Sequence, residues 1–362
     1  MYMTNTLAPT APQPAAAPLR ATGLTDSSAD ILADLFAGRS LTQGESERLF
    51  GALVAGTLDE PSIAALLIAL RIKGETKAEL IGAARALRAA DAPFDRPDYL
   101  FADSCGTGGD GSGTINLSTA VAFVAAAAGL PIAKHGNRSI TSRCGSADVL
   151  EAMGVNIEMS AAMSRRALDQ IGLCFLFAPA YHPGLKHAGP VRRALKVRTI
   201  MNLLGPCVNP AEPPVQLLGV ADARLLDSVA SVLAALGVRE ALVVHGAGLD
   251  EVAPHAETEA VRLSGGALTS LTLSPEQAGL ARSPLLSVRG GSPAENAARL
   301  KALLAGGGSR ADREAVALNA GALLMTAGLA ADFRDGVALA LDTLASGAPV
   351  RKLQALVELT HG

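Results

Sequence analysis

Short apolar runs alternate with helical segments through most of this chain, and the alternation limits the folds open to it. Five such runs lie at 99–103, 130–133, 173–178, 215–220 and 241–244. Strands that alternate with helices pair in parallel and are covered by helices on both faces. The pattern therefore predicts an α/β fold whose large domain has a central, mostly parallel sheet. Two further runs around Ser264-Gly265-Gly266 predict a hairpin, and 293–359 is expected to be largely helical.

A small all-helical domain is predicted for 26–93, where apolar residues recur at helical spacing. Thr42 and Glu45 have the spacing of a capping box at a helix start. Gly74 stands where a helix can end. The sequence thus separates a helical domain from the α/β domain that follows it.

Two further segments complete the predicted domain organisation. From about 190 to 204 the chain is again helical and basic, and we expect this segment to join the helical domain. The large domain then comprises 94–189 and 205–362. Residues 1–25 contain four prolines and no basic residue before Arg20, so we expect a disordered tail without a secretory signal.

Composition and charge argue against several classes of function. At 362 residues and 49% hydrophobic content, the chain can bury the cores of two domains. A net charge of −3 and 3% aromatic residues argue against a nucleic-acid partner, which needs a basic surface and stacking platforms. The longest uncharged apolar run, 120–133, is interrupted by Gly129 and Pro131 and is too short to span a membrane. We therefore expect a cytoplasmic globular protein that binds neither nucleic acid nor membrane.

A glycine-rich segment between Cys105 and Thr119 is the strongest functional signal. Five glycines occupy the eight positions 106–113, after one apolar run and before another of helical length. Glycines accept positive φ and let backbone N–H groups approach an anion, and the N-terminus of a following helix adds unpaired donors. The segment therefore predicts a phosphate-binding loop. The alternative is a flexible surface loop.

Two familiar phosphate motifs do not fit this loop. Gly106, Gly108 and Gly111 match G-x-G-x-x-G, but a dinucleotide site also needs an acidic residue about 20 positions on, and none occurs before Ala147. A P-loop needs Lys followed by Ser or Thr after its last glycine, and no such pair follows the glycines of this loop. What remains is the carboxylate of Asp110 with a hydroxyl and amide cluster, expected on the first turn of a helix: Thr114, Asn116, Ser118 and Thr119. This set suits a phosphorylated sugar with a metal ion nearby.

Two more segments follow predicted strands, and their side chains suit the same ligand. Lys134 begins a turn rich in glycine and hydroxyl groups, which can bind a pyrophosphate through its ammonium group and backbone N–H groups. Asp250-Glu251 follows the run 241–244, and Mg²⁺ prefers one or two carboxylates together with water and substrate phosphates. Each segment alone is also compatible with a solvated turn. Because ligands bind at the carboxyl ends of parallel strands, the three segments are expected to converge.

Four segments in this order, 106–119, 134–146, 192–210 and 246–251, resemble the anthranilate phosphoribosyltransferase family. The resemblance covers nearly the whole chain after the tail. It implies a small helical domain, a large α/β domain, an active site in the cleft, and a homodimer joined through the helical domains. The implied reaction transfers the phosphoribosyl group of 5-phosphoribosyl 1-diphosphate to the amine of anthranilate, in tryptophan biosynthesis. The products are N-(5-phosphoribosyl)anthranilate and diphosphate, and two Mg²⁺ per active site are implied.

The resemblance also implies roles for individual positions. The diphosphate and ribose loop is matched by Gly109, Asp110, Thr114, Asn116, Leu117, Ser118 and Thr119. The second phosphoribosyl-diphosphate segment is matched by Lys134, His135, Gly136, Asn137, Arg138, Ser139, Ile140, Thr141, Ser142 and Ser146. Contacts to anthranilate, or the lining of its approach, are matched by Gly106, His135, Asn137, Arg192, Gly205 and Pro206. The Mg²⁺ ligands are matched by Ser118, Asp250 and Glu251.

The implied chemistry asks little of side chains as acids or bases. Lys134 and the loop N–H groups would assist the diphosphate leaving group, and positioning of the amine behind C1 of the ribose supplies much of the rest. His135 is interpreted as lining, because an aniline nitrogen becomes acidic as it attacks and water can take its proton. Three departures from the family pattern lie beside the acceptor site: Lys196 for a usual glycine, Met201 for a phenylalanine and Cys207 for a leucine.

Two other functions remain open. A pyrimidine nucleoside phosphorylase-like enzyme shares the fold and a Lys-His turn, but the Gly-Thr-Gly-Gly-Asp loop and the tandem Asp250-Glu251 favour a metal-bound diphosphate. A non-catalytic binding paralogue of the same fold should lack the Arg192 and Asn137 pair or carry a basic surface. This chain does neither.

Overall fold

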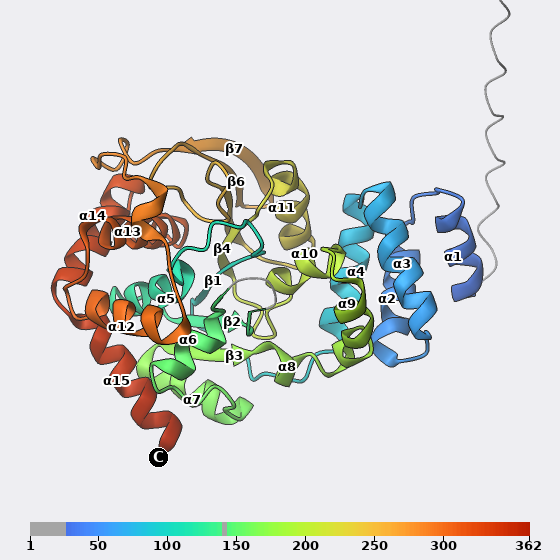
Figure 1. Cartoon of the computed structure of the whole chain (residues 1–362), viewed down its shortest axis with the longest axis horizontal. Helices are drawn as coiled ribbons and strands as arrows, with labels where there is room; N and C mark the ends of the chain where they lie inside the picture. Colours follow the sequence, from blue (N-terminus) through green and yellow to red (C-terminus); the bar gives the residue numbers. More distant parts are fainter. Residues whose placement is uncertain (1–26, 140–142) are drawn as a thin grey trace, which may run out of the picture.

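Four helices form the N-terminal lobe of the protein (Figure 1). The structure is a computed structural model that describes residues 27–139 and 143–362. The lobe contains α1 (Ser28–Phe36), α2 (Gln43–Ala55), α3 (Glu60–Lys73) and α4 (Lys77–Ala89). The capping box predicted at the start of α2 is confirmed: Thr42 Oγ1 accepts the Glu45 N–H at 3.3 Å, and Glu45 Oε2 accepts the Thr42 N–H at 2.7 Å. Gly74 ends α3 with φ +85°, which glycine adopts without strain.

The large domain is built on a seven-stranded sheet in the order β3-β2-β1-β4-β5-β6-β7. Its strands are β1 (Ala102–Gly106), β2 (Ile132–Gly136), β3 (Leu173–Phe177), β4 (Val215–Gly219), β5 (Glu240–His245), β6 (Thr258–Ser264) and β7 (Ala267–Leu273). Strands β1 to β5 are parallel, and β6 and β7 form the predicted antiparallel hairpin. The mostly parallel sheet is thereby confirmed. The strand order reverses beside β1, which lies between β2 and β4, and ligands bind at such reversals.

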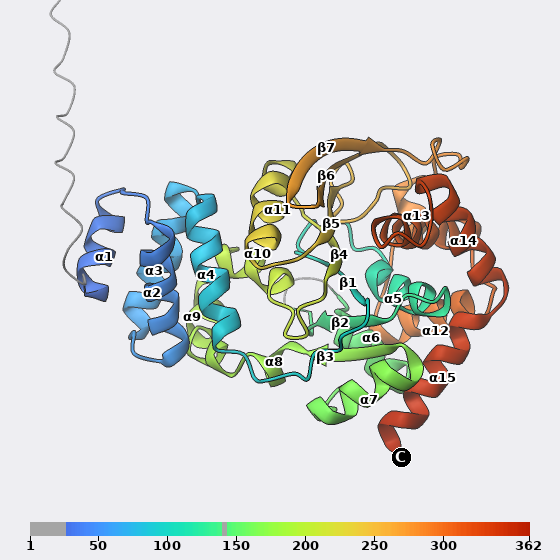
Figure 2. The same ribbon diagram turned by 180° about the vertical axis from the view of Figure 1, so that it is seen from behind.

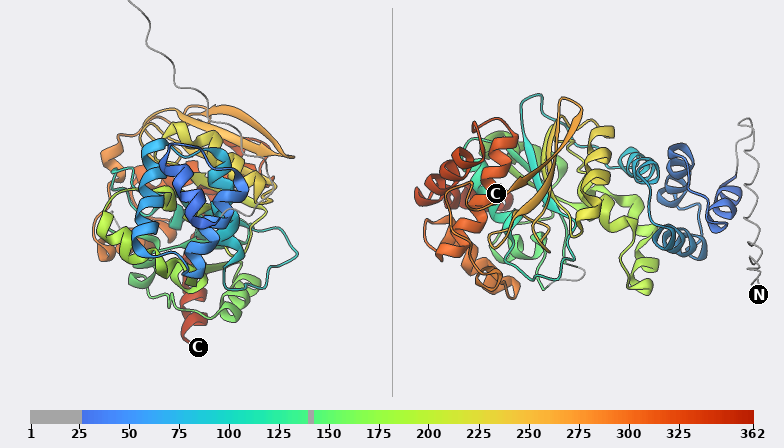
Figure 3. Two further views of the ribbon diagram at one scale, coloured as in Figure 1. Left: turned by 90° about the vertical axis from the view of Figure 1, so that its right-hand side faces the viewer. Right: turned by 90° about the horizontal axis from the view of Figure 1, so that it is seen from above.

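Helices cover both faces of this sheet (Figures 1 and 2). One face carries α5 (Leu117–Ala127), α12 (Pro293–Leu304), α13 (Arg310–Thr326), α14 (Phe333–Ala345) and α15 (Ala348–His361). The other carries α10 (Ile200–Cys207) and α11 (Leu226–Ala235). The helices α6 (Ser146–Ala152), α7 (Ala161–Ile171) and α8 (Ala178–Tyr181) lie near the β3 end of the sheet. The 3₁₀ turn η1 (Pro183–His187) and α9 (Gly189–Leu195) pack against α2 and α3 of the helical lobe. Figure 3 shows the sheet between the two layers, with the helical lobe beyond the second.

One buried apolar cluster runs from the sheet into the helical lobe. It includes Leu218 of β4, Leu204 of α10 and Leu70 of α3, each fully buried. The segment 190–204 forms α9 and the start of α10, and α9 packs against α3. Val191 of α9 belongs to the same cluster. Residues from both lobes therefore share one apolar core.

Strand β1 begins three residues later than the apolar run 99–103 predicts. Tyr99 and Leu100 are 36% and 40% exposed, whereas the polar Asp103 is fully buried within the strand. Its carboxylate accepts hydrogen bonds from Asn209 Nδ2 at 2.9 Å and from the His135 backbone N–H at 3.3 Å. Partners distant in the sequence thus make burial of Asp103 acceptable, and hydropathy could not predict them.

Three other boundaries differ from the sequence predictions. Thr114 and Asn116 precede α5, which begins at Leu117, instead of lying on its first turn. His135 lies within β2 and not after it, because the strand continues to pair with β3 through Gly136. Pro206 lies inside α10, in the last turn, where its missing N–H costs one hydrogen bond. No helix within 27–139 and 143–362 combines the length and apolar character that a membrane crossing requires.

Candidate active site

The carboxyl ends of β1, β2 and β5 lie at one edge of the sheet and bring the three predicted segments together. The Gly108 N–H donates to Asp250 Oδ2 at 2.6 Å and so joins the glycine loop to the acidic pair. Lys134 Nζ donates to the Ser104 carbonyl at 2.6 Å and lies 3.2 Å from Ser118 Oγ. The convergence expected from the order of the strands is present.

The glycine loop has a backbone suited to an anion. Positive φ angles of +63°, +73°, +74° and +62° occur at Gly108, Gly109, Gly111 and Gly113. Residues with a Cβ rarely adopt such angles, which explains why glycine stands at these four positions. Asp110 holds the turn by accepting the Ser112 N–H at 3.1 Å and its hydroxyl at 2.8 Å. Turns that place successive N–H groups on one side form concave anion sites.

The segment after the loop is held by backbone and amide contacts. Thr114 forms an isolated β-bridge with Arg289. Asn116 Nδ2 donates to the Cys144 carbonyl at 3.1 Å, and Asn116 Oδ1 accepts from Asn296 Nδ2 at 3.0 Å. The Asn116 side chain therefore ties the first loop to the second.

Leu117 and Thr119 differ in what they offer a ligand. Leu117 is 1% exposed and packs in the core, so only its backbone can face a substrate. Thr119 is also buried, and its Oγ1 has no hydrogen-bond partner in the described part of the chain. Such a hydroxyl can still hydrogen-bond a group brought in by a ligand.

The carboxyl groups of Asp110, Asp250 and Glu251 lie close together. Burial first, and then the negative charge of Asp110, raise the pKa of Asp250 to about 7. Burial and the charge of Asp250 raise the pKa of Glu251 well above its ordinary value, while Lys134 and the Ser118 backbone N–H oppose that rise. Like charges held together in a partly buried site repel each other unless a cation is bound. The cluster is therefore suited to bind a cation.

The donor set fits Mg²⁺ held jointly with a substrate. In 27–139 and 143–362 no group of three or more His, Cys, Asp or Glu side chains could enclose a metal ion alone. Mg²⁺ keeps several waters and binds through one or two carboxylates plus substrate phosphates. Asp250 and Glu251 supply the carboxylates, and Ser118, whose Oγ lies 3.2 Å from Lys134 Nζ, adjoins Glu251 through its backbone N–H. Oxygen atoms are hard ligands, so this donor set is better suited to Mg²⁺ than to a softer metal ion.

The second loop packs closely on α6. Arg138 pairs with Glu151 at 2.7 Å and with Asp148 at 3.3 Å, so its guanidinium is held by carboxylates of α6. The Ser139 N–H donates to Asp148 Oδ2 at 3.0 Å, and Ser146 Oγ donates to the Asn137 carbonyl at 3.3 Å. The predicted positions Ile140, Thr141 and Ser142 lie outside the described residues.

Two predicted glycines stand where backbone and side chains approach closely. A Cβ at Gly106 would lie 2.3 Å from Asp250 Oδ2, and one at Gly136 would lie 2.2 Å from Ser146 Oγ. A Cβ at Gly205 would meet nothing within 4 Å, so open space adjoins that position. The neighbouring Pro206 carbonyl accepts from Gln216 Nε2 at 2.8 Å, which fixes this turn of α10.

Arg192 on α9 is a half-buried cation without a counter-ion. Burial lowers the pKa of its guanidinium, and no acidic group opposes the change. Within the described residues the guanidinium forms no hydrogen bond or ion pair with the protein. Arg193 beside it is exposed. A desolvated, unpaired guanidinium suits the carboxylate of a bound ligand.

Sequence reasoning missed Arg198, which reaches from the segment between α9 and α10 to the glycine loop. Arg198 NH1 donates to the Gly108 carbonyl, and a Cβ at Gly109 would lie 1.4 Å from the same nitrogen. Arg71 of α3 donates in turn to the Arg198 carbonyl. The helical lobe is thus connected to the phosphate loop, and only the count of basic residues near 190–204 hinted at it.

The three departures from the family pattern fall into two kinds. Lys196 ends α9 with φ +53°, which explains why glycine is usual at this position. Met201 and Cys207 are 3% and 2% exposed and belong to the apolar cluster shared by the lobes.

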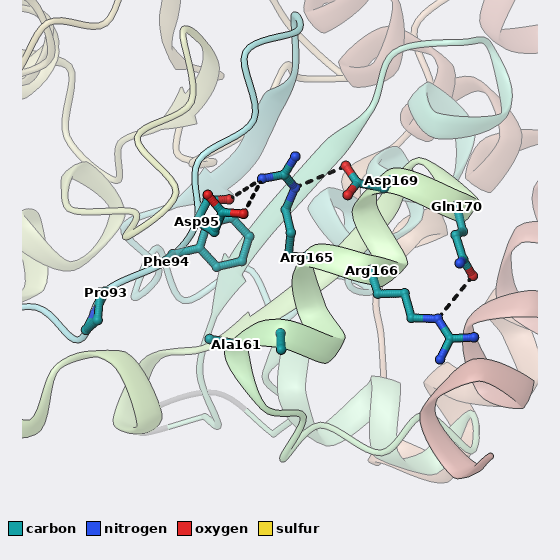
Figure 4. Close-up of a pocket in the computed structure, with 9 residues that line it drawn as sticks. Pro93, Phe94, Asp95, Ala161, Arg165, Arg166, Asp169 and Gln170 are labelled. Atoms are coloured by element: carbon teal, nitrogen blue, oxygen red, sulfur yellow. Dashed lines mark hydrogen bonds and ion pairs between the residues drawn. The ribbon is translucent and has the colours of Figure 1, made fainter.

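A surface hollow of about 660 Å³ lies apart from these residues (Figure 4). Arg165 of α7 crosses it and pairs with Asp95 at 2.9 Å and with Asp169 at 3.0 Å. Asp95 belongs to the segment that connects the two lobes. Arg166, which also lines the hollow, donates to Gln170 Oε1 at 3.4 Å, and none of the predicted site residues lines it, so this hollow is separate from the predicted site.

Gly219 offers a steric test of the acidic pair. A Cβ at this end of β4 would lie 1.6 Å from the Asp250 carbonyl oxygen, so Gly219→Ala must displace the Asp250 backbone. We expect a folded protein whose affinity for Mg²⁺ with phosphoribosyl diphosphate falls at least about tenfold, since a displacement near 1 Å disrupts such sites. Calorimetric titration measures it. Gly51→Ala in α2, where a Cβ meets nothing within 4 Å, is the control; equal affinities in both variants would contradict the placement.

Comparison with known proteins agrees with this geometry. Residues 98–350 match the glycosyl transferase family, a/b domain, and residues 29–90 match the helical bundle domain of the glycosyl transferase family. An anthranilate phosphoribosyltransferase of Sorangium cellulosum is 57% identical over 331 residues, covering 91% of this chain and 95% of that protein. One of Yersinia pseudotuberculosis is 50% identical over 322 residues, covering 89% and 97%.

Solved structures lead to the same family. Anthranilate phosphoribosyltransferase from Thermus thermophilus superposes with a TM-score of 0.88 at 42% identity, covering 92% of this chain and all 100% of that one. The enzyme from Saccharomyces cerevisiae, in complex with PRPP and Mg, superposes with a TM-score of 0.85 at 25% identity over 92% and 98%. With its predicted fold confirmed, this chain belongs to the anthranilate phosphoribosyltransferase family of glycosyl transferases.

Proposed function

We propose that this enzyme transfers the phosphoribosyl group of 5-phosphoribosyl 1-diphosphate to the amine of anthranilate, a step in tryptophan biosynthesis. One arrangement carries the proposal. An acidic pair, Lys134 and a positive-φ glycine loop meet on the large domain, while the unpaired Arg192 stands on α9 of the helical side. The first group suits a metal-bound diphosphate, and the second suits the carboxylate of an aromatic acceptor.

Two Mg²⁺ ions per site are proposed, one at Ser118 and one at Asp250 and Glu251. The raised pKa values of Asp250 and Glu251 support a cation there. The related yeast enzyme was solved with PRPP and Mg, which supports use of this metal. When bound, the ions would neutralise charge that develops on the departing diphosphate.

The side chains would position the reactants more than they react. The N–H groups of the glycine loop and the ammonium of Lys134 would stabilise the leaving diphosphate. Arg192 and Asn137 would hold anthranilate so that its amine faces C1 of the ribose. Gly106, Gly205 and Pro206 would leave room for the ring. Fixing two reactants in attack geometry can replace several kcal/mol of activation free energy, about 7–11 in favourable cases.

A homodimer joined through the helical domains is proposed as well. Phe36 of α1 and Ile72 of α3 are 56% and 80% exposed, and both lie on the helical lobe. Light scattering on the purified protein measures the mass. We also propose a cytoplasmic location, which fits a biosynthetic enzyme with diffusible substrates and which cell fractionation tests.

Crossed substrate tests distinguish this function from phosphorolysis. With anthranilate, phosphoribosyl diphosphate and Mg²⁺, mass spectrometry should detect N-(5-phosphoribosyl)anthranilate and diphosphate. With thymidine and phosphate, no thymine should form. Thymine formation without Mg²⁺, and no transfer to anthranilate, would favour the nucleoside phosphorylase instead.

A further inference from the structure

Three buried side chains form a continuous hydrogen-bonded chain behind the acceptor side of the site. His182 Nδ1 bonds Asp91 Oδ1, and His182 Nε2 lies 3.0 Å from His135 Nε2. The two imidazole rings meet edge to face with centroids 4.9 Å apart. The residues come from three places: after α4, after α8 and within β2. No local sequence pattern could have connected them.

The three side chains are enclosed, and charged groups lie beside both ends of the chain. The side chains of His182 and Asp91 are 4% and 8% exposed, and His135 is 6% exposed. Asp91 faces Arg88 and Glu212, and Lys134 is the cation beside His135. Burial, followed by His182 and Lys134, lowers the pKa of His135 well below its ordinary value, while the Gly205 carbonyl favours its protonated form. His135 is therefore a neutral ring at working pH.

The hydrogen bonds fit two protonation states of the chain, because burial raises the pKa of Asp91 and this carboxyl can stand ionised or protonated beside His182. If Asp91 is ionised, His182 donates from Nδ1 and leaves Nε2 as an acceptor. His135 must then donate from Nε2, so its Nδ1 is the bare nitrogen. The nearby Gly205 belongs to the positions implied to line the approach of anthranilate. A vacant basic nitrogen would thus stand at the acceptor side.

We propose that His135, His182 and Asp91 form a relay that takes the proton released by the attacking amine. The inference rests on the proposed function and extends it, because it assigns a base. His135 would touch the substrate as a catalytic residue. His182 and Asp91 would act through it as positioning residues.

The amine nitrogen forms a bond to C1 of the ribose, the C1–O bond breaks, and its electron pair leaves with diphosphate. One amine N–H proton passes to His135 Nδ1, the Nε2 proton of His135 passes to His182 Nε2, and an imidazolium at His182 remains beside the Asp91 carboxylate. The proton returns to solvent after product release. A weak base suffices, because an arylammonium nitrogen is a strong acid.

The alternative is a latch, in which the three side chains only hold the two lobes together and move no proton. This alternative explains less of the arrangement than the relay does. The Ala92 N–H already donates to the Tyr181 carbonyl at 2.8 Å and joins the same two segments. A latch also needs no second histidine reaching the acceptor side. The site already contains Arg192 and Lys134, so a further cation on the bound amine would be costly in a partly buried cleft. A relay moves that charge to a buried carboxylate.

His182→Gln and Asp91→Asn test the relay, with pH profiles of kcat and KM as the readout. Glutamine can hydrogen-bond both neighbours but cannot pass a proton. We expect kcat to fall about 100-fold, the lower end for loss of a general base. The KM values of both substrates should stay nearly unchanged. The double variant should be no slower than the slower single variant, because the residues act as one unit.

The acid limb of the kcat profile separates relay from latch. Asp91→Asn removes the charge that stabilises the imidazolium, so the limb should move to lower pH. A merely structural residue would lower activity without moving it. His361→Gln, the same exchange on the exposed C-terminal helix, is the control and should behave as the parent. Unchanged kcat in both relay variants, or a fall with an unmoved limb, overturns the proposal.

A measurement on the unaltered enzyme covers the case in which the variants fail to fold. Nitrogen-15 NMR of the histidines at pH 8 should find His182 protonated on Nδ1 and His135 on Nε2 only. A proton on Nδ1 of His135, or a doubly protonated His182 at rest, overturns the relay. If the parent enzyme transfers nothing to anthranilate, the proposed function fails instead, and the two failures are distinguished by that assay.

Discussion

Replacement of both carboxylates of the acidic pair, Asp250→Asn with Glu251→Gln, should abolish turnover at millimolar Mg²⁺. The amides keep the shape of the site but remove the charges that a divalent cation requires. Metal ions stabilise the transition state by several kcal/mol, which corresponds to a loss of at least about a thousandfold in kcat. Steady-state rates over a range of Mg²⁺ concentrations measure the effect.

The matched control exchanges two exposed carboxylates of the same domain. Glu257→Gln with Glu259→Gln makes the same change in net charge beside and on β6. This double variant should keep parental rates and parental Mg²⁺ dependence. If the Asp250 and Glu251 variant also keeps both, the metal assignment is wrong.

Arg192→Ala should raise the KM for anthranilate strongly and leave the affinity for phosphoribosyl diphosphate nearly intact. The guanidinium is half-buried and unpaired in the described part of the chain, so a ligand carboxylate would be its partner. A hydrogen bond to a charged group contributes about 1.5–3 kcal/mol. This range corresponds to roughly a 10- to 150-fold change in KM.

Arg193→Ala is the control, because this neighbouring arginine is exposed on the same helix. It should show the parental KM for anthranilate. Arg192→Lys should recover only part of the loss, since an ammonium cannot pair with a carboxylate through two parallel bonds. Parental KM values in both alanine variants would show that Arg192 is not the acceptor clamp, even if transfer survives.

The sequence predicted the features that depend on local periodicity and on strand order. The alternation of apolar runs was sufficient for the parallel sheet, and the Thr42 capping box located the start of α2. The meeting of the glycine loop with Asp250 followed from the position of their strands. The residue types of the loops and the order of the strands were therefore sufficient to predict that these loops meet.

Features that depend on partners distant in the sequence could not be predicted from it. Asp103 is buried within β1 because Asn209 satisfies it, and no window around residue 103 contains that partner. Arg198 contacts the Gly108 carbonyl across 90 positions. The bond between His182 and His135 likewise joins residues 47 positions apart. Hydropathy and spacing describe residues that are neighbours in the sequence, whereas these contacts join residues that only the tertiary fold brings together.

Loss of anthranilate fluorescence on addition of phosphoribosyl diphosphate tests the central claim most directly. The account predicts a decrease that requires the enzyme and Mg²⁺, stops on chelation of the metal, and releases one diphosphate for each anthranilate consumed. Unchanged fluorescence with folded enzyme, both substrates and Mg²⁺ would contradict the account.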